Sequence, residues 1–241
     1  MIVLFTDFGR EGPYVGQMLA VLARLAPGVP AIDLLADAPA FDAKASAYLL
    51  AAYADEFSAG TVFLAVVDPG VGGDRQPLWV EADGRHFVGP DNGLFEVILR
   101  RAKRHRVRRI AWQPEKLSAS FHGRDLFAPF AAGLARGAPP ASVEIDAATV
   151  RRPEWPDDWA AIIYIDRFGN AMTGLRAARL DPGARISLDV HTLGRARTFS
   201  EMGPGEAFWY ENANGLVEIA ANRASAARNL TLTVGSTFTI K

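Results

Sequence analysis

The chain has 241 residues, which is enough for one large domain or two small ones. Its hydrophobic content of 49% and charged content of 22% are typical of a globular protein. With 26 Lys and Arg against 27 Asp and Glu, the net charge is −1, so no broad attraction to nucleic acid or anionic lipid is expected. The absence of cysteine excludes disulfides, thiolate nucleophiles and Cys-ligated zinc.

The sequence gives no sign of a membrane segment or a signal peptide. No apolar stretch approaches the ~20 residues that a membrane helix needs, and the N-terminus has neither a basic start nor a long apolar run. We therefore expect a cytoplasmic protein without nucleic-acid or membrane partners. The basic run 100–109 contains no aromatic residue and is interpreted as the solvated end of a helix.

The first part of the chain alternates predicted strands with predicted helices. Asp42 is expected to cap the second of these helices. This alternation predicts an α/β N-terminal domain with a mostly parallel sheet covered on both faces. The expected strands are 2–5, 31–35, 61–67, 78–82, 86–88 and 109–112, and the expected helices are 15–22, 45–52, 94–104 and 126–136.

The pattern changes near residue 138, where proline-rich segments with weak periodicity begin. Beyond them short strands dominate, which predicts a smaller all-β domain, a sandwich or a barrel. The predicted organisation is a catalytic α/β domain at 1–145, a linker at 146–159 and the β domain at 160–241. The expected strands of the β domain are 160–164, 185–190, 216–220 and 230–240.

Three side chains of complementary chemistry lie at predicted strand ends or in glycine turns. Asp68 follows the apolar strand 61–67, Arg75 ends a glycine turn, and His122 lies between a predicted strand and a predicted helix. Such positions are exposed at the carboxyl edge of an α/β sheet, where ligands bind. A carboxylate, a guanidinium and an imidazole can hold a water, take its proton and stabilise the hydroxide. The alternative is a plain turn with a structural histidine.

Asp7 follows the first strand, where a carboxylate can accept two hydrogen bonds from a ribose diol or simply start a turn. The segment 70–73 superficially resembles a phosphate loop. It lacks the glycine spacing of the dinucleotide motif and leads into a predicted strand, so no helix N-terminus is available for an anion. Asp91 and Asn92 could face a ligand, but capping of the helix beginning at Leu94 is the preferred interpretation.

In the second domain, Phe168 could stack on a planar base while Asn170 reads its edge with one donor and one acceptor. A plain turn is again the alternative. A polar loop at 209–215 precedes a strand and could form a second edge in contact with a ligand.

Taken in order, the motifs Thr-Asp-Phe-Gly at 6–9, Val-Val-Asp-Pro-Gly-Val-Gly at 66–72, Gly-Pro-Asp-Asn-Gly-Leu-Phe at 89–95, Phe-His-Gly-Arg-Asp at 121–125, Ile-Asp-x-Phe-Gly-Asn at 165–170 and Asn-Gly-Leu-Val-Glu-Ile-Ala at 214–220 span nearly the whole chain. In this order they resemble the S-adenosylmethionine hydroxide adenosyltransferases, relatives of the fluorinating and chlorinating enzymes that use the same substrate.

The resemblance implies a homotrimer with active sites between subunits. No metal and no other cofactor are expected, because the sulfonium leaving group of the substrate is already activated. It implies that Asp68, Arg75 and His122 activate water, that Asp7 holds the ribose, and that residues of the second domain bind the substrate from the neighbouring chain. One departure is Ala213, where the family often has a serine that helps to bind the methionine end. The expected substrate-binding residues are Asp7, Phe121, Asp166, Phe168, Asn170, Asn214 and Asn222.

The predicted reaction is the hydrolysis of S-adenosylmethionine to adenosine and methionine by attack of water at ribose C5′. Which member of the trio takes the proton stays open at this point. Two other classes are kept. One is a metal-dependent hydrolase of a phosphate or nucleoside, and the other is a non-catalytic sensor of adenosine or S-adenosylmethionine. The metal site of the first would use Asp7, Asp68, Asp91, Asp125 and His122.

Overall fold

The computed structural model describes residues 1–241, which form two compact units. The N-terminal unit contains residues 1–51 and 57–154, and the C-terminal unit contains residues 52–56 and 155–241. The chain belongs to the second unit briefly at residues 52–56, at the end of the second helix, and then from Trp155 onward.

The N-terminal unit is built on a seven-stranded sheet of order β2-β1-β3-β5-β4-β6-β7. Strands β2, β1, β3 and β5 are parallel, and each further neighbour is antiparallel. Its elements are β1 (Ile2–Thr6), α1 (Tyr14–Leu25), β2 (Ala31–Leu35), α2 (Ala43–Ala54), β3 (Val62–Val66), β4 (Pro77–Ala82), β5 (Arg85–Pro90), α3 (Glu96–Arg101), β6 (His105–Ile110), the π-helix η1 (Gly123–Phe127), α4 (Ala128–Ala135), β7 (Ser142–Ile145) and the 3₁₀ helix η2 (Ala147–Val150).

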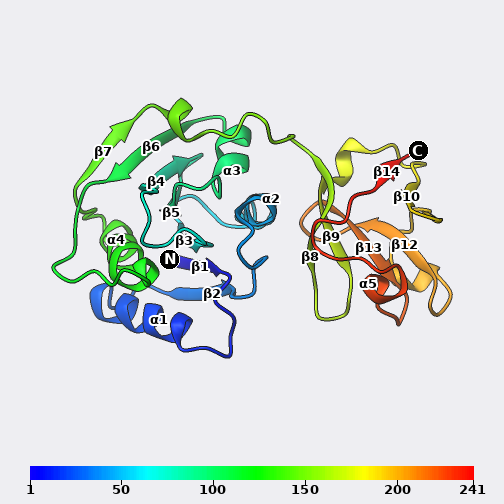
Figure 1. Cartoon of the computed structure of the whole chain (residues 1–241), viewed down its shortest axis with the longest axis horizontal. Helices are drawn as coiled ribbons and strands as arrows, with labels where there is room; N and C mark the ends of the chain where they lie inside the picture. The colour runs from blue at the N-terminus through cyan, green and yellow to red at the C-terminus, as the bar shows by residue number, and fades with distance from the viewer. The chain divides into compact units, whose positions relative to one another are not determined.

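Helices cover both faces of this sheet, as the strand–helix alternation predicts. In Figure 1, α1 and α4 lie together on one side of the sheet, while α2 and α3 lie on the other. Every residue of β1 and β3 is buried, which is typical of parallel strands covered on both faces. Ile2 and Leu4 pack with Met18 of α1 and Phe130 of α4 in one core. The predicted α/β class is confirmed, and the antiparallel strands beyond β5 extend the sheet.

Local predictions succeed where one pattern dominates. Asp42 caps α2 by accepting the backbone N–H of Ala45 at 2.9 Å. The interpretation of 100–109 as a helix end is correct only for Arg100 and Arg101, because residues 105–110 form β6 between β4 and β7. Val107 and Ile110 are the only apolar residues of this strand, and the arginines around them made its strand pattern hard to recognise. Arg108 packs on the neighbouring strand, with its Cζ 5.3 Å from the centroid of the Trp79 ring.

The C-terminal unit contains two antiparallel sheets, one of order β12-β13-β9-β8 and one of order β11-β10-β14. Its main core joins Trp209, Ile219 and Ile162. Its elements are β8 (Trp159–Ile165), β9 (Ala171–Arg176), the 3₁₀ helix η3 (Ala177–Arg179), β10 (Ile186–Leu188), β11 (His191–Leu193), the 3₁₀ helix η4 (Phe199–Glu201), β12 (Ala207–Glu211), β13 (Leu216–Ala221), α5 (Ala226–Asn229) and β14 (Thr239–Ile240).

The predicted strand at 230–240 is wrong except at its end. A short helix, α5, precedes this segment and is capped by Ser225, whose side chain accepts the backbone N–H of Arg228. Thr231 then takes a positive φ of 54°, which ends any extended path. Only β14 pairs with β10. The alternation of threonine with apolar residues therefore reflects an irregular segment whose apolar members Leu232 and Phe238 still reach the core.

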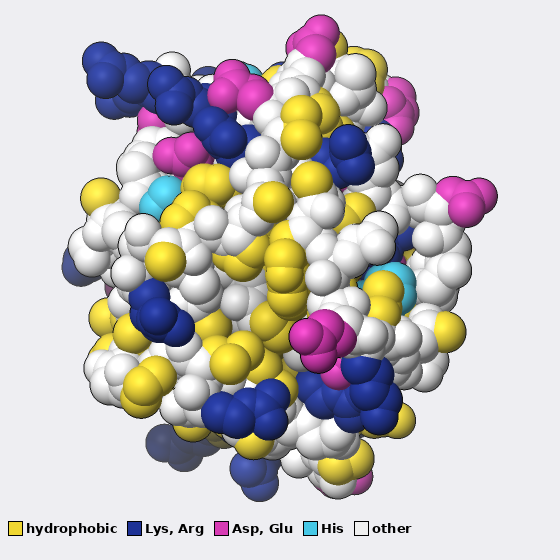
Figure 2. Space-filling model, turned by 90° about the vertical axis from the view of Figure 1, so that its left-hand side faces the viewer, with side chains coloured by type: hydrophobic (Ala, Val, Ile, Leu, Met, Phe, Trp, Pro, Cys, Tyr) yellow, Lys and Arg dark blue, Asp and Glu magenta, His cyan; other side chains and the backbone are white.

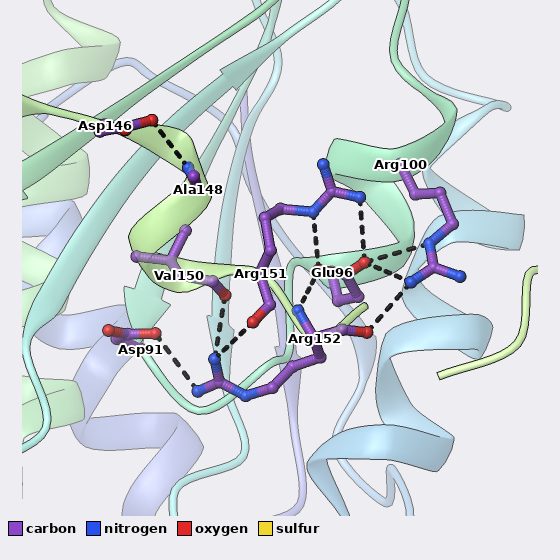
Figure 3. A network of polar contacts seen from close by, with 8 residues as sticks. All are labelled: Asp91, Glu96, Arg100, Asp146, Ala148, Val150, Arg151 and Arg152. Carbon is purple, nitrogen blue, oxygen red and sulfur yellow. Dashed lines mark hydrogen bonds and ion pairs between the residues drawn. The ribbon is translucent and has the colours of Figure 1, made fainter. Parts of the chain in front are cut away.

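A buried glutamate fixes the end of the N-terminal unit (Figure 3). The Glu96 side chain has no exposed surface and accepts hydrogen bonds from Arg100, from Arg151 and from the backbone N–H of Arg152. Its pKa is lowered by these donors in spite of its burial. Because several donors satisfy one buried carboxylate, the last residues before the C-terminal unit are held on α3.

On the face shown in Figure 2, Lys and Arg side chains are dispersed among acidic and apolar ones, and no continuous basic surface forms. None of the helices combines the length and the apolar composition that a bilayer span requires.

Candidate active site

The parallel part of the sheet brings two of the predicted acidic residues to one edge. Strands β1 and β3 are parallel neighbours, and Thr6 pairs with Val66. Asp7 and Asp68 follow these two strand ends, so both carboxylates lie at the carboxyl edge of the sheet.

The glycine turn after β3 brings the histidine loop close. Gly72 has φ +82°, and a Cβ built on it would lie 2.6 Å from the carbonyl oxygen of Ala119. Only glycine fits this conformation and this approach. The turn that carries Arg75 therefore packs against the loop that ends at His122, which stands directly before η1.

The structure brings Asp68, Arg75 and His122 together. Arg75 Nε donates to both carboxylate oxygens of Asp68 at 2.9 Å, and Nη2 donates to Asp68 Oδ2 as well. Arg75 Nη2 also lies 2.9 Å from His122 Nδ1. Phe127 covers the guanidinium, whose Cζ lies 5.3 Å from the ring centroid. The side chains of Asp68 and Arg75 are 4% and 11% exposed, so solvent screens these contacts little.

This geometry sets the proton positions on His122. A guanidinium carries only donors, so Nδ1 must accept the Arg75 hydrogen bond. The proton of the neutral imidazole is therefore on Nε2. Burial of His122 and, next, the Arg75 charge lower its pKa, although Asp68 and Asp125 act in the opposite direction. A neutral His122 thus presents an N–H donor at Nε2, for which the protein supplies no partner. The two N–H groups of Arg75 Nη1 are open in the same way.

Beside the trio lies a cavity of about 380 Å³, called here the front cavity, whose lining includes Asp7, Asp68, Phe121 and His122. Asp7 Oδ2 accepts the backbone N–H of Phe41 at 3.0 Å, which leaves Oδ1 for another donor. Burial raises the pKa of Asp7, and the Asp68 charge adds to this effect. The predicted residues Asp7, Phe121, Asp68 and His122 therefore share one cavity.

Aromatic side chains complete the front cavity, and sequence reasoning missed most of them. Phe8, Tyr14 and Phe121 form mutual ring contacts with centroids 5.3 to 5.8 Å apart. Phe41 is 77% exposed and has a positive φ of 61°. A bulky residue in that conformation is strained. The only signal in the sequence was an aromatic residue within the polar turn before α2.

A second cavity of about 690 Å³ lies within the C-terminal unit, and Asp166, Phe168 and Asn170 line it. Asp166 accepts the backbone N–H groups of Phe168 and Asn170 and the Asn170 side-chain amide, at 2.8 to 2.9 Å. The side-chain amide of Asn170 keeps one N–H and its oxygen Oδ1 free, whereas the backbone carbonyl accepts the N–H of Asp166. Gly169, with φ +85°, leaves no room for a side chain, since its Cβ would lie 2.0 Å from Ser225 Oγ. Phe168 is 77% exposed.

The floor of this cavity contains a polar group that the sequence analysis did not single out. Glu218 is 2% exposed and accepts hydrogen bonds from Tyr210 Oη at 2.7 Å and Asn212 Nδ2 at 2.9 Å. Burial raises the pKa of Glu218, and burial together with the Glu218 hydrogen bond raises the pKa of Tyr210. Glu218 is the single charged residue in the otherwise apolar strand β13, and this was the signal available in the sequence.

Asn214 and Ala213 both line the cavity in the C-terminal unit. Asn222 does not line it. Its side chain donates to the carbonyl oxygen of Met202 at 2.6 Å, so this amide holds a turn in the structure.

The five residues of the metal-site alternative are not assembled into one donor group. The structure contains no group of three or more His, Cys, Asp or Glu side chains placed to share an ion. Asp125 accepts from Arg124 and from the backbone of Ser118. Asp91 lies 3.6 Å from Arg152.

The fold and the site together define a two-domain protein in which an α/β unit carries a buried carboxylate–guanidinium–imidazole group and a β unit carries a polar, aromatic cavity. The S-adenosylmethionine hydroxide adenosyltransferase family models match this arrangement, the N-terminal domain over residues 2–144 and the C-terminal domain over residues 160–239. The chain belongs to this family.

Similar proteins carry a consistent name. An "(R)-S-adenosyl-L-methionine hydrolase" of Thermus thermophilus is 39% identical, covering 97% of this chain and 96% of its own. One of Salinispora tropica is 35% identical over 95% and 93%. A solved structure of a conserved Thermotoga maritima protein superposes with a TM-score of 0.89 at 27% identity, covering both chains fully.

Proposed function

We propose that this protein is an enzyme that hydrolyses S-adenosyl-L-methionine to adenosine and L-methionine. The oxygen of water or hydroxide bonds to ribose C5′, the C5′–S bond breaks, and its electron pair stays on the methionine sulfur. Family membership and the names of the relatives support this substrate. Those names specify the (R) compound, so the proposal includes that configuration.

The observation that carries the proposal is the trio with its open donors. Arg75 Nη1 and, in the neutral imidazole, His122 Nε2 both offer N–H groups without a protein partner. Hydrogen bonds to the charged form of a group favour that form, so these donors would lower the pKa of a bound water. We assign to Asp68 the role of holding the Arg75 fork in position through its bidentate contact.

His122 then acts in this proposal as a hydrogen-bond donor to the nucleophile. Its Nδ1 already accepts from Arg75, and its Nε2 already carries a proton, so neither nitrogen is free to take the proton of water. The proton leaves to solvent instead. As the anionic oxygen attacks and the sulfonium becomes a neutral thioether, opposite charges are neutralised in a buried site, which favours the transition state.

We propose binding roles for the remaining residues. Asp7 accepts a ribose hydroxyl with its open oxygen, beside the Phe121 ring of the front cavity. Phe168 stacks on the adenine, and Asn170 pairs with its edge through one donor and one acceptor, because both groups remain open in the cavity of the C-terminal unit. Asp166 holds Asn170, and Asn214 contributes to the same cavity.

The family resemblance further supports a homotrimer, with each active site shared by the N-terminal unit of one subunit and the C-terminal unit of the next. The exposed Phe168 would be covered in such an assembly. His122→Ala subunits and Asn170→Ala subunits should both turn over poorly at substrate concentrations well below the Kd of the Asn170→Ala variant. Mixing them at such a concentration should then restore part of the activity, because some mixed sites carry neither lesion. A fully active monomer in light scattering would exclude this assembly.

The experiment that tests the activity is chromatography of purified protein incubated separately with the (R) and (S) epimers of S-adenosylmethionine. We expect adenosine and methionine in equal amounts, from the (R) compound in particular. Activity that survives a strong chelator supports the absence of a metal cofactor, and its loss supports the metal-dependent hydrolase. Tight binding without product would identify a sensor. Cell fractionation tests the proposed cytoplasmic location.

A further inference from the structure

The trio forms part of the wall between two cavities. Behind the front cavity lies another of about 340 Å³, called here the rear cavity, whose lining includes Gly73, Arg75, Arg109, Ala111, Leu117 and His122. Asp68 lines only the front cavity, Arg75 lines only the rear one, and His122 lines both. All these residues belong to the N-terminal unit.

The rear cavity offers donors for a small oxygen ligand. Both N–H groups of Arg75 Nη2 are engaged by Asp68 and His122, whereas those of Nη1 have no protein partner. Phe127 packs against the guanidinium and fixes its plane. No carboxylate lines this cavity, and Arg109 adds a second guanidinium to it. Water or hydroxide is therefore favoured there over a cation.

The reaction proposed above consumes one water and releases one proton in each turnover. A substrate whose ribose is bound at Asp7 occupies the front cavity and blocks it as a path for solvent. The nucleophile and the proton then need a path that the substrate leaves open. The rear cavity touches the trio through Arg75 and His122, and its lining contains none of the residues proposed to bind the substrate.

We propose that the rear cavity is the water supply of the active site: water enters it, is held by Arg75, passes to the front cavity beside His122, and the released proton leaves by the same path. This inference rests on the proposed hydrolase activity. Under this proposal, residues that line the rear cavity, such as Ala111 and Leu117, also determine turnover, although they do not contact the substrate.

The first test fills the rear cavity from lining residues that do not belong to the trio. Ala111→Trp adds bulk at an exposed position that follows β6, and Gln113→Trp does the same two residues later. We expect kcat to fall about tenfold or more in both, with the Kd for S-adenosylmethionine changed less than about twofold, since only delivery of the nucleophile is impeded. Ala111→Ser controls for the position, and Ala148→Trp controls for an exposed tryptophan outside the cavity.

The second test measures which nucleophile arrives. In water–methanol mixtures, attack by methanol gives 5′-O-methyladenosine, methionine and a proton. Leu117→Ala widens the rear cavity and should raise the ratio of methyl ether to adenosine about threefold, whereas Ala111→Trp should lower it. A change in folding alone would reduce both products together and leave this ratio unchanged.

Unchanged kcat and an unchanged product ratio in Ala111→Trp, Gln113→Trp and Leu117→Ala would overturn the water-supply role while the wild type still makes adenosine. If the wild type makes no adenosine, the proposed function itself fails. If the tryptophan variants weaken substrate binding as much as turnover, the rear cavity is part of the substrate site and the inference is wrong.

Discussion

The front cavity of the N-terminal unit and the cavity of the C-terminal unit are both lined by residues of the sequence motifs, but their polar groups differ in what they do. In the N-terminal unit, Asp68, Arg75 and His122 bind one another and leave donors open, with His122 lining the front cavity and both Arg75 and His122 lining the rear one. In the C-terminal unit, Asp166 and Glu218 satisfy amide, hydroxyl and backbone donors around a larger one. The first arrangement suits charge stabilisation, and the second fixes amides and rings for recognition. We infer that chemistry and recognition are divided between the two domains.

The largest effect is expected from the trio. His122→Ala and Arg75→Ala should each lower kcat by roughly 10²-fold or more, with a smaller change in substrate affinity, because their donors act on the nucleophile. Steady-state kinetics and calorimetric binding measure the two quantities. Full activity in either variant would show that the division of roles is wrong.

Two further substitutions separate donor from base. The His122→Gln side chain can supply an N–H near Nε2, whereas the His122→Asn side chain can supply only the acceptor for Arg75. If His122 donates from Nε2, the glutamine variant should retain about tenfold more activity than the asparagine variant. Equal loss in both would favour proton abstraction by His122.

A smaller effect, on affinity, is expected in the C-terminal unit. Asn170→Ala removes the open amide groups and the contact with Asp166, and should weaken substrate binding about tenfold while kcat changes less. Asn229→Ala is the matched control, since Asn229 is exposed and does not line the cavity. A loss confined to kcat would place Asn170 in the chemistry instead.

The pH dependence should also follow the N-terminal unit. Protonated His122 would carry an N–H on Nδ1 facing the Arg75 donor, so the trio requires the neutral imidazole. Burial and the Arg75 charge lower the pKa of His122. We therefore expect kcat to keep its full value at a pH just below ~6.5, the ordinary pKa of histidine, and to be lost only as the pH falls through the lowered pKa. The kcat–pH profile measures this midpoint. A midpoint above ~6.5 would contradict a neutral, donor-bound His122.

The smallest effect concerns Ala213, which lines the cavity where the family often has serine. Ala213→Ser should tighten binding of S-adenosylmethionine by about two- to threefold through one added hydrogen bond, with kcat unchanged. Ala213→Val serves as a size control. A weaker serine variant would show that the methionine end lies elsewhere.

The sequence predicted which acidic residues lie at the carboxyl edge of the sheet better than it predicted the side-chain contacts formed there. Asp7 and Asp68 were expected at strand ends on the carboxyl edge of the sheet, because alternating strands and helices imply a parallel sheet. The pairing of β1 with β3 makes these two strand ends neighbours. The contact between Arg75 and His122 depends on the close approach of Gly72 to Ala119, which brings together residues that are far apart in the sequence. No local pattern contains that information.

The lining of the cavities was harder to foresee. In the sequence, Phe41 is only a residue of a turn and Glu218 only a residue of a strand. Their places in the cavities depend on tertiary neighbours, Asp7 for Phe41 and Tyr210 for Glu218, which the sequence does not reveal. Asn222 shows the converse. It was expected to bind substrate, yet its amide holds the Met202 carbonyl. The tautomer of His122 is likewise set by a single hydrogen bond that spacing cannot predict.

The most direct measurement of the central claim is hydrolysis in heavy-oxygen water followed by mass spectrometry of both products. Attack of water at C5′ places the label in the 5′-hydroxyl of adenosine and leaves methionine unlabelled. We expect one labelled oxygen per adenosine formed. Unlabelled adenosine, or 5′-methylthioadenosine in place of adenosine, would contradict it.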